Sequence, residues 1–433
     1  MDIAIDLIIL LVLLALGVPI PFCFMAAVLF LIAVHGFSFE FLLPISFFGL
    51  NSLTLLSVPF FIMAGGLMGS SGIAERLVKI GIALVGRFRG GLGGATVVAT
   101  AIFGAIAGLC SAAVAAIGSI MIPRMEAEGY PRGHATALVT VSSVLAQLIP
   151  PSVPMILYAW VCRVSVASCF LSTIGPGIVS IFLYCFINWW MCRKIPSINV
   201  YPKVGLWQQT REVGQSIYRG TFSLMGALII MVGIYGGFTT PTEAATLAVI
   251  YTVFVGFVIY KTLSWRELGR TLFTTATTSG VVIMMLFFVI MLSRLYVMLN
   301  VPQRLIKAMT GISDNYYIIL AMVNVFLILI GMLMDDFSGT LLSAPLLLPL
   351  MRHIGVSPYH FAAILGTNLG LGNVTPPCAP ILYLGGRMAN CPFDKMIGPA
   401  TVFMVFGSLP VILITTYWPD LALFLPRLIM GVE

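Results

Sequence analysis

Long apolar runs separated by short polar loops occupy nearly the whole chain. Because about 20 consecutive apolar residues are needed to cross a bilayer, the pattern predicts a membrane protein built from helices. Glycine and prolines at 17–21 interrupt the apolar run 3–34, so one kinked helix or two short helices both fit. The other predicted helical segments are 41–68, 92–122, 134–165, 168–191, 221–238, 241–260, 276–299, 315–350 and 396–417.

Two apolar segments contain closely spaced prolines. PPSVP occupies residues 150–154, and PPCAP occupies 376–380, about half the chain further on. Proline lacks the backbone donor and clashes with the preceding turn, so each segment is predicted to be a broken helix. Backbone groups freed inside a membrane need protein, water or an ion as partners. Paired broken helices in two halves are typical of a transporter's binding site.

The two halves share more than these prolines. Several pairs have the same separation as the two Pro-Pro motifs: Pro123 with Pro349, Met125 with Met351, Gly129 with Gly355, and His134 with His360. Residues 76–79 resemble 304–307, and 17–21 resemble 237–241, at slightly different separations. Gene duplication followed by small loop changes explains this order better than chance does.

Each half also contains a candidate re-entrant hairpin. The centre of the first hairpin, at 104–113, is rich in small residues. The centre of the second hairpin, at 335–340, is polar. With the hairpins adding no crossing, each half crosses the membrane an odd number of times. The predicted fold is therefore an all-α polytopic membrane protein with two inverted-topology repeats, each holding a re-entrant hairpin and a broken helix.

Composition supports the membrane prediction. The chain has 433 residues, 60% hydrophobic and 9% charged, with a mean hydropathy of +1.08, whereas soluble domains carry about 25% charged residues. The net charge of +7 lies in short loops and is interpreted as a topology signal, not as a nucleic-acid surface. Basic residues in the linker 193–219 place it in the cytoplasm, which puts the N-terminus and the segment 304–307 outside. The two positive charges of Arg304 and Lys307 would then lie outside, which is a small departure from the positive-inside rule.

Signatures of enzymes and of ATP hydrolysis are absent. The chain has no GxxxxGK[ST], HExxH or GxSxG motif, so we predict that it is not an enzyme. The energy source is expected to be an ion gradient or another chain. The eight cysteines form no CxxC pair and are interpreted as small buried apolar residues. The N-terminus lacks secretory-signal features and is read as the first membrane segment.

Hydroxyl and carboxylate residues gather at the hairpin centres and helix breaks. Hydroxyls, carboxylates and unwound carbonyls are hard oxygen ligands that suit an alkali cation. The serines could instead bond to their own helix backbone, and Asp335 and Asp336 could form a solvated turn. The predicted cation-binding residues are Ser111, Ser143, Pro150, Ser152, Asp336, Ser338, Gly339, Thr367, Asn368, Gly372 and Thr375.

Half-helix N-termini at the same breaks would attract an anionic group of a substrate. The predicted substrate-binding residues are Ser111, Pro151, Ser152, Ser338, Asn373, Pro377 and Arg294. Arg294 lies inside an apolar run and could meet an anionic substrate or extend to the membrane surface. Glu243 follows a proline at a helix start, where capping and ion binding are both consistent with a carboxylate.

Several motifs resemble the large membrane (M) subunit of tripartite ATP-independent periplasmic (TRAP) transporters. These are FGAI at 103–106, AAIGSIMIP at 115–123, IPPSVPM at 149–155, FTTPTEAA at 238–245 and NVTPP at 373–377. Family members commonly carry a Gly-Ser-Ser-like hairpin tip, whereas this chain has Gly108-Leu109-Cys110-Ser111. The departure weakens any role for Cys110 as a side-chain ligand.

The resemblance implies sodium-coupled import of an organic anion, such as sialic acid or a C4-dicarboxylate, across the bacterial inner membrane. It implies an elevator mechanism, a periplasmic substrate-binding protein and a separate small four-helix membrane subunit. In this scheme the first repeat is 1–192, with scaffold helices at 3–70 and transport elements at 92–165. A cytoplasmic linker follows at 193–220. The second repeat is 221–433, with scaffold helices at 221–299 and transport elements at 315–390.

Other functions remain to be separated from this one. A stand-alone sodium–dicarboxylate symporter of similar architecture would transport without a soluble binding protein. An ion channel also uses unwound carbonyls, but it has no need of two inverted hairpins. A membrane enzyme or a purely structural subunit would likewise not explain the inverted repeat.

Overall fold

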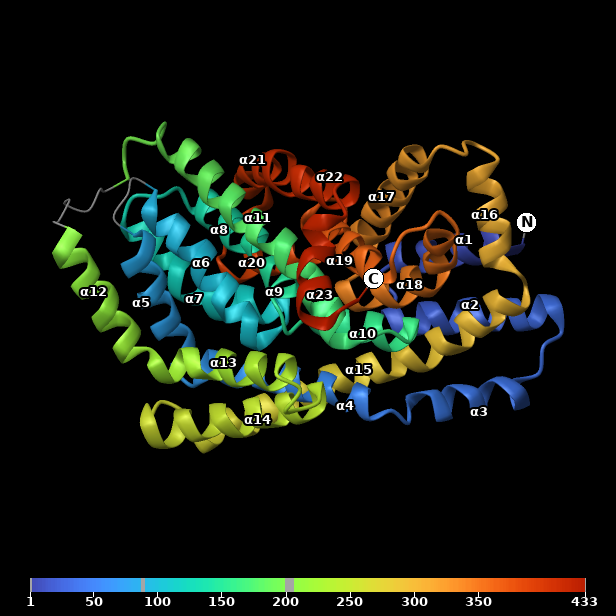
Figure 1. Cartoon of the computed structure of the whole chain (residues 1–433), viewed down its shortest axis with the longest axis horizontal. Helices are drawn as coiled ribbons and strands as arrows, with labels where there is room; N and C mark the ends of the chain where they lie inside the picture. The colour runs from blue at the N-terminus through green and yellow to red at the C-terminus, as the bar shows by residue number, and fades with distance from the viewer. Residues whose placement is uncertain (1, 87–89, 199–205, 433) are drawn as a thin grey trace.

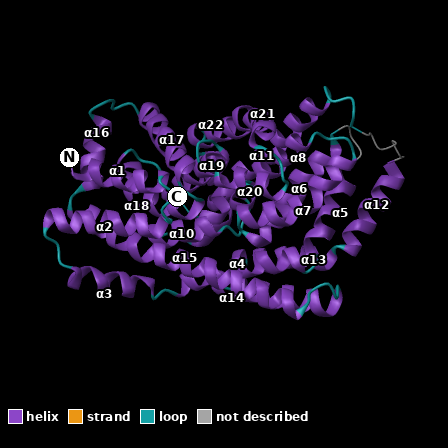
Figure 2. Cartoon of the chain, turned by 180° about the vertical axis from the view of Figure 1, so that it is seen from behind, coloured by secondary structure: helices purple, strands orange, loops and turns teal. Residues whose placement is uncertain are grey.

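A computed structural model describes residues 2–86, 90–198 and 206–432, and these residues form helices with no strand among them (Figures 1 and 2). Within these ranges, seven helices are long and apolar enough to cross a membrane, and a bent pair at 211–235 adds an eighth candidate. Shorter apolar helices accompany them. The all-α polytopic prediction is confirmed.

The first half contains eleven helices within the described residues. The first helix ends before Gly17, which has φ of +80°, and Pro19 is the N-cap of the second helix. Residues 3–34 therefore form two helices instead of one kinked span. The helices are α1 (Asp2–Ala15), α2 (Ile20–His35), α3 (Phe39–Leu50), α4 (Leu53–Ser70), α5 (Ile73–Val85), α6 (Gly91–Ala107), α7 (Cys110–Ala127), α8 (Arg132–Ser142), α9 (Leu145–Leu148), α10 (Val153–Cys162) and α11 (Val166–Cys192).

The second half begins after the linker, part of which, 199–205, lies outside the described residues. Its elements are α12 (Leu206–Arg219), α13 (Thr221–Tyr235), α14 (Pro241–Phe254), η1 (Val255–Ile259), α15 (Trp265–Met298), α16 (Val301–Thr310), α17 (Tyr316–Leu333), α18 (Asp336–His353), α19 (Pro358–Val374), α20 (Pro380–Met388), α21 (Phe393–Phe403), η2 (Met404–Ser408), α22 (Leu409–Tyr417) and α23 (Asp420–Met430).

Two helix starts in this half are capping boxes, in which side chain and backbone satisfy each other's free groups. Thr240 and Glu243 begin α14, so the exposed Glu243 carboxylate caps its own helix. Ser264 and Glu267 begin α15, which therefore starts about ten residues before the apolar run predicted at 276–299. Helix α23 was not predicted from the sequence.

The order of elements is the same in the two halves. In the first half the short amphipathic helix α5 is followed by the hairpin α6–α7 and then by the broken helix α8–α9–α10. In the second half the short amphipathic helix α16 is followed by the hairpin α17–α18 and then by the broken helix α19–α20. Helices α5 and α16 lie at opposite ends of the molecule (Figure 1). The repeated order with opposite placement agrees with the predicted inverted repeat.

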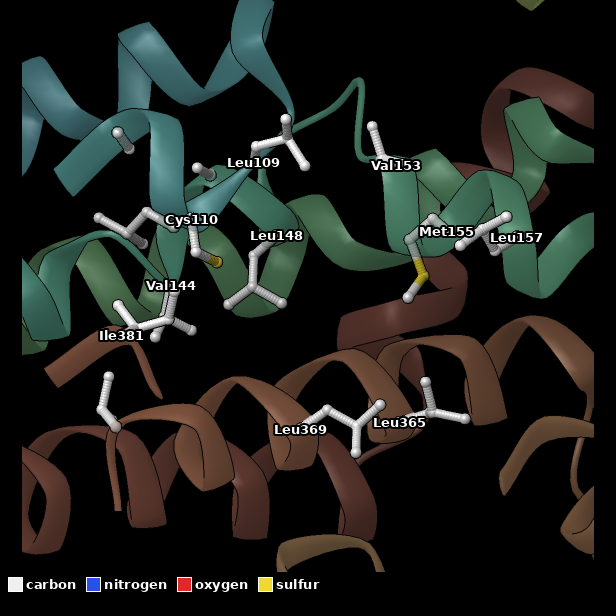
Figure 3. Close-up of a cluster of buried hydrophobic side chains, with 14 of the residues drawn as sticks. Leu109, Cys110, Val144, Leu148, Val153, Met155, Leu157, Leu365, Leu369 and Ile381 are labelled. Carbon is white, nitrogen blue, oxygen red and sulfur yellow. The ribbon is translucent and has the colours of Figure 1, made fainter. Parts of the chain in front are cut away.

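The two broken helices pack against each other in the core. Gly370 of α19 is so close to α9 that a Cβ there would lie 2.4 Å from Val144 and 2.3 Å from Gln147. Apolar side chains from both repeats surround this crossing, among them Leu148, Leu365 and Leu369 (Figure 3). Because lipid is as apolar as these side chains, close packing holds the crossing together.

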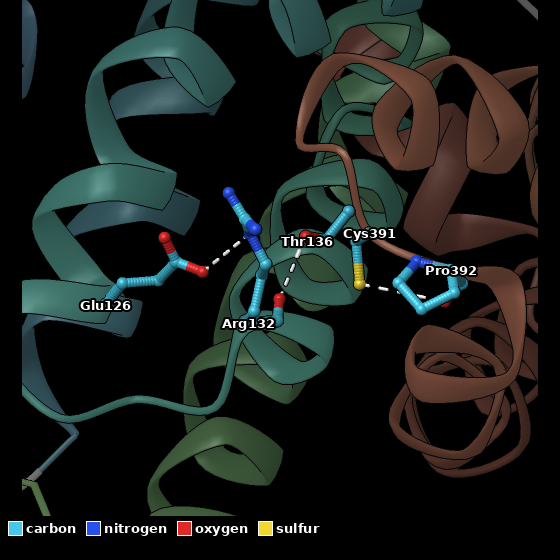
Figure 4. A network of polar contacts seen from close by, with 5 residues as sticks. All are labelled: Glu126, Arg132, Thr136, Cys391 and Pro392. Atoms are coloured by element: carbon cyan, nitrogen blue, oxygen red, sulfur yellow. Dashed lines mark hydrogen bonds and ion pairs between the residues drawn. The ribbon is translucent and has the colours of Figure 1, made fainter.

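Polar contacts fix the turn between α7 and α8 (Figure 4). Arg132 Nε lies 2.8 Å from Glu126 Oε1, and the Thr136 hydroxyl donates to the Arg132 carbonyl at 2.9 Å. Nearby, the Cys391 thiol donates to the Pro392 carbonyl in the loop before α21. A Cβ on Gly133 would lie 2.0 Å from the Lys395 carbonyl oxygen, so the backbones of α8 and α21 are in direct contact.

Candidate functional site

The tip of the first hairpin docks onto the break in the first broken helix. Gly108 ends α6 with φ of +65°, and its carbonyl accepts a hydrogen bond of 3.2 Å from the Val153 amide. A Cβ on Gly108 would lie 2.7 Å from the Pro151 carbonyl oxygen. Glycine is therefore required here both by the left-handed backbone and by the close approach.

The first break itself spans 149–152, between α9 and α10. Pro150, Pro151 and Ser152 are buried, and the Ser152 hydroxyl has no hydrogen-bond partner in the described part of the chain. The Ser143 hydroxyl donates to the Thr140 carbonyl at 2.7 Å, as in ordinary backbone bonding within a helix. Ser111, just past the hairpin tip, is exposed.

The second hairpin turns at Met334 and Asp335. Asp335 is the N-cap of α18; its carboxylate accepts the Ser338 amide at 3.3 Å and also the Ser338 hydroxyl. The next residue, Asp336, is buried within the interior, and its Oδ1 atom has no hydrogen-bond partner among the described residues. The two aspartates thus have different roles: one caps the helix, and the other retains a free oxygen.

The two hairpin tips meet. Asp336 lies beside Cys110, the first residue of α7. The Cys110 thiol also donates to the Gln147 side-chain oxygen at 3.6 Å, and the Gln147 amide donates to the Gly366 carbonyl at 2.8 Å. Hairpins and broken helices from both repeats therefore converge on one buried region.

The second break, at 375–379, has similar features. Both side-chain atoms of the buried Asn373 lack partners within the described residues. Thr375 and Thr367 donate to carbonyls one turn earlier in α19, and the Asn368 amide donates to Asn324 Oδ1 at 2.9 Å. Pro377 is exposed.

The convergent region is rich in buried oxygen atoms without a partner in the described chain. A buried polar atom left unpaired costs about 1–3 kcal/mol, so a set of them calls for water or a ligand as a partner. Hydroxyls that donate to backbone, such as those of Ser143, Thr367 and Thr375, still have lone pairs available for a cation. The unpartnered oxygens belong to Ser142, Ser152, Asp336, Thr340, Ser343, Asn368 and Asn373.

The donor set favours an alkali cation over a transition metal. Among the described residues no group of three or more histidine, cysteine, aspartate or glutamate side chains is placed to hold a metal ion. Hydroxyl, amide and carboxylate oxygens are what remains, and these are hard ligands. The oxygen atoms of this region are therefore ligands of the kind that an alkali cation prefers.

Sequence reasoning missed two polar residues of this region. Gln147 links the first hairpin tip to α19, and Asn324 of α17 accepts hydrogen bonds from Asn368 and from Thr416 at 3.1 Å. A polar residue inside an apolar run was the available signal in both cases. Gln147 also precedes the first proline pair by only three residues.

Arg294 lies apart from the other predicted substrate residues. It lines a cavity of about 770 Å³ between α3, α10, α15 and α18, and no other residue predicted for the sodium or substrate site lines that cavity. The structure therefore brings together the residues of the hairpins and breaks and separates Arg294 from them.

Gly372, another predicted site residue, is a point of close approach between α17 and α19. A Cβ there would lie 2.4 Å from Gly331 backbone atoms. We expect Gly372→Ala to destabilise the protein by about 1–3 kcal/mol, as overpacking does. Gly280→Ala is the matched control, because a Cβ at that helical position meets nothing within 4 Å. Melting of the two purified variants in detergent measures the difference; equal melting temperatures would contradict the predicted contact.

Comparisons with known proteins give the same assignment throughout. Residues 7–421 match the family described as "Tripartite ATP-independent periplasmic transporter, DctM component". The sialic acid TRAP transporter large permease protein SiaM of Vibrio cholerae is 31% identical over 416 residues, which is 96% of each chain. The C4-dicarboxylate large permease DctM of Rhodobacter capsulatus is 30% identical, covering 88% of this chain and 89% of that one.

Two further similarities extend the comparison. The isethionate TRAP transporter permease protein DctMQ of Oleidesulfovibrio alaskensis is 31% identical over 95% of this chain, which spans 64% of that protein's length. The crystal structure of the Alcanivorax borkumensis YdaH transporter, described as having an unusual topology, superposes with a TM-score of 0.58 at 13% identity. The superposition covers 86% of this chain and 85% of the YdaH chain, and it shows that the two proteins share a fold. The chain belongs to the DctM family, the large permease subunits of TRAP transporters, and is a multi-pass membrane transport protein, not an enzyme.

Proposed function

We propose that this chain imports a carboxylate-bearing organic anion across the bacterial inner membrane, driven by a sodium gradient. The observation that carries the proposal is the convergence of two hairpin tips and two helix breaks around buried oxygens without partners in the described chain. Sodium would be held by Asp336, by the hydroxyls and by carbonyls freed at the breaks. The helix N-termini at Val153 and Pro380 would face the substrate carboxylate.

Coupling follows if sodium stabilises the tip geometry that also forms the anion site, since a ligand shifts only states that it binds differently. Movement of the hairpins and broken helices against α3, α4 and α15 would carry the site across the membrane as an elevator. The substrates named for relatives, sialic acid, C4-dicarboxylates and isethionate, are all organic anions. The first two carry carboxylates and support that class for the present chain, whereas isethionate is a sulfonate.

The proposal includes two protein partners. A small membrane subunit would pack beside the scaffold helices, and a periplasmic protein would deliver the substrate. The name DctMQ, for a relative longer than this chain, supports the first partner. The N-terminus and α16 would face the periplasm, and α5 and α12 the cytoplasm.

Uptake into proteoliposomes tests the proposal. The chain is reconstituted with its small subunit, and flux of labelled succinate and sialic acid is followed with and without a sodium gradient and with and without the cognate binding protein. Saturable uptake requiring both sodium and the binding protein is expected. Non-saturating, sodium-independent flux would indicate a channel, and uptake without the binding protein would indicate a stand-alone symporter.

A further inference from the structure

The cavity that contains Arg294 is large enough for a small molecule. Its volume of about 770 Å³ falls within the range of about 300–1,000 Å³ typical of ligand sites. Its polar lining consists of Arg163, Ser293 and Arg294, and the remaining lining residues are apolar, glycine or tryptophan. No acidic residue lines it. The cavity is thus a cationic site with apolar walls.

Both guanidinium groups are available to a ligand. Arg163 and Arg294 are exposed and line the cavity, and neither guanidinium group has an ion pair or a hydrogen bond among the described residues. Other arginines of the chain do have partners: Arg132 pairs with Glu126, and Arg427 pairs with Asp420. A guanidinium offers a planar set of donors that matches a carboxylate or phosphate group.

Arg163 also has an unusual backbone conformation. Arg163 caps the C-terminus of α10 with φ of +54°, a left-handed conformation that favours glycine or asparagine. An arginine is unfavourable there on conformational grounds.

The two arginines come from parts of the fold that the proposed mechanism moves relative to each other. Arg163 follows the broken helix, and Arg294 lies near the C-terminal end of the long helix α15. Phe48 of α3 and Pro345 of α18 also line the cavity. An anion between the two guanidinium groups would therefore bridge α10 and α15.

We propose that this cavity is a second anion site, separate from the hairpin tips, in which Arg163 and Arg294 together bind a carboxylate or phosphate group. Trp160 and Phe48 would contact the apolar part of the ligand. The same chemistry is offered by a free organic acid and by the headgroup of an anionic phospholipid. Binding of an anion in this cavity does not require that transport be coupled to sodium.

Trp160 provides a local probe for the test, because it lines this cavity. The full chain is placed in phosphatidylcholine nanodiscs and titrated with succinate or inorganic phosphate; a second set of nanodiscs contains phosphatidylglycerol. The fluorescence change of Trp160 is obtained as the difference between the wild type and Trp160→Phe. A saturable change with succinate or phosphate identifies a free anion, and a change with phosphatidylglycerol alone identifies the lipid headgroup.

Three variants decide whether the arginines are responsible. Arg294→Gln and Arg163→Gly are each expected to weaken the response at least tenfold. Glycine suits the left-handed backbone at 163, so Arg163→Gly should keep the wild-type melting temperature, and its loss of binding would not be unfolding. Arg304→Gln removes an exposed charge from α16, outside the cavity, and should bind as the wild type does. No saturable change with any of the three probes, or an unchanged affinity in both cavity variants, would overturn the proposal.

Discussion

Asp336→Asn is expected to raise the sodium concentration needed for half-maximal uptake at least about tenfold, equivalent to about 1.4 kcal/mol of binding free energy. The reason is the free Asp336 Oδ1, a buried carboxylate oxygen with no hydrogen-bond partner among the described residues. Ionisable groups this deep in a membrane protein are costly and are retained for ions or substrates. Asparagine keeps the size of the side chain but removes its negative charge.

The neighbouring aspartate is a matched control for this experiment. Asp335 caps α18 through the Ser338 amide, and asparagine is about as good an N-cap as aspartate. Asp335→Asn should therefore change the sodium dependence much less than Asp336→Asn does. Both variants are compared by sodium-dependent uptake into proteoliposomes, with the amount of inserted protein measured separately. A wild-type sodium requirement in Asp336→Asn would remove this residue from the sodium site.

Much of the fold was predictable because the membrane limits the choices. Spacing of the apolar runs located most helices, and the two proline clusters located the breaks at 149–152 and 375–379. The early start of α15 was missed, because its first turns are polar and are specified by the capping box of Ser264 and Glu267. Helix α12 lies inside the polar linker, where no apolar run indicates a membrane segment.

The site was predictable by residue type but not by contact. Hydroxyls and carboxylates near the breaks could be proposed because oxygen ligands suit sodium. That Gln147 reaches the Gly366 carbonyl, more than 200 residues away, depends on how the two repeats pack. The same holds for Arg294: its position within an apolar run indicates function, but only the packing of α3, α10, α15 and α18 shows which cavity it enters.

Gly108→Ala is expected to abolish most sodium-dependent uptake, by tenfold or more, while leaving the protein inserted in the membrane. The added methyl group would meet the Pro151 carbonyl oxygen at 2.7 Å, and the left-handed backbone adds a penalty of about 1–2 kcal/mol. The clash would push the first hairpin tip away from the break, and with it Cys110, which lies beside Asp336. Both repeats of the proposed site would then be disturbed by one methyl group.

Gly355→Ala separates these two effects. Gly355 also has a left-handed backbone, with φ of +80°, but a Cβ there meets nothing within 4 Å. The two variants therefore share the backbone penalty, and only Gly108→Ala adds the clash with the first break. Uptake and melting temperature are measured for both proteins in parallel. If docking of the tip on the break is needed for transport, Gly355→Ala retains most of its uptake; equal losses in the two variants would show that backbone strain alone is responsible.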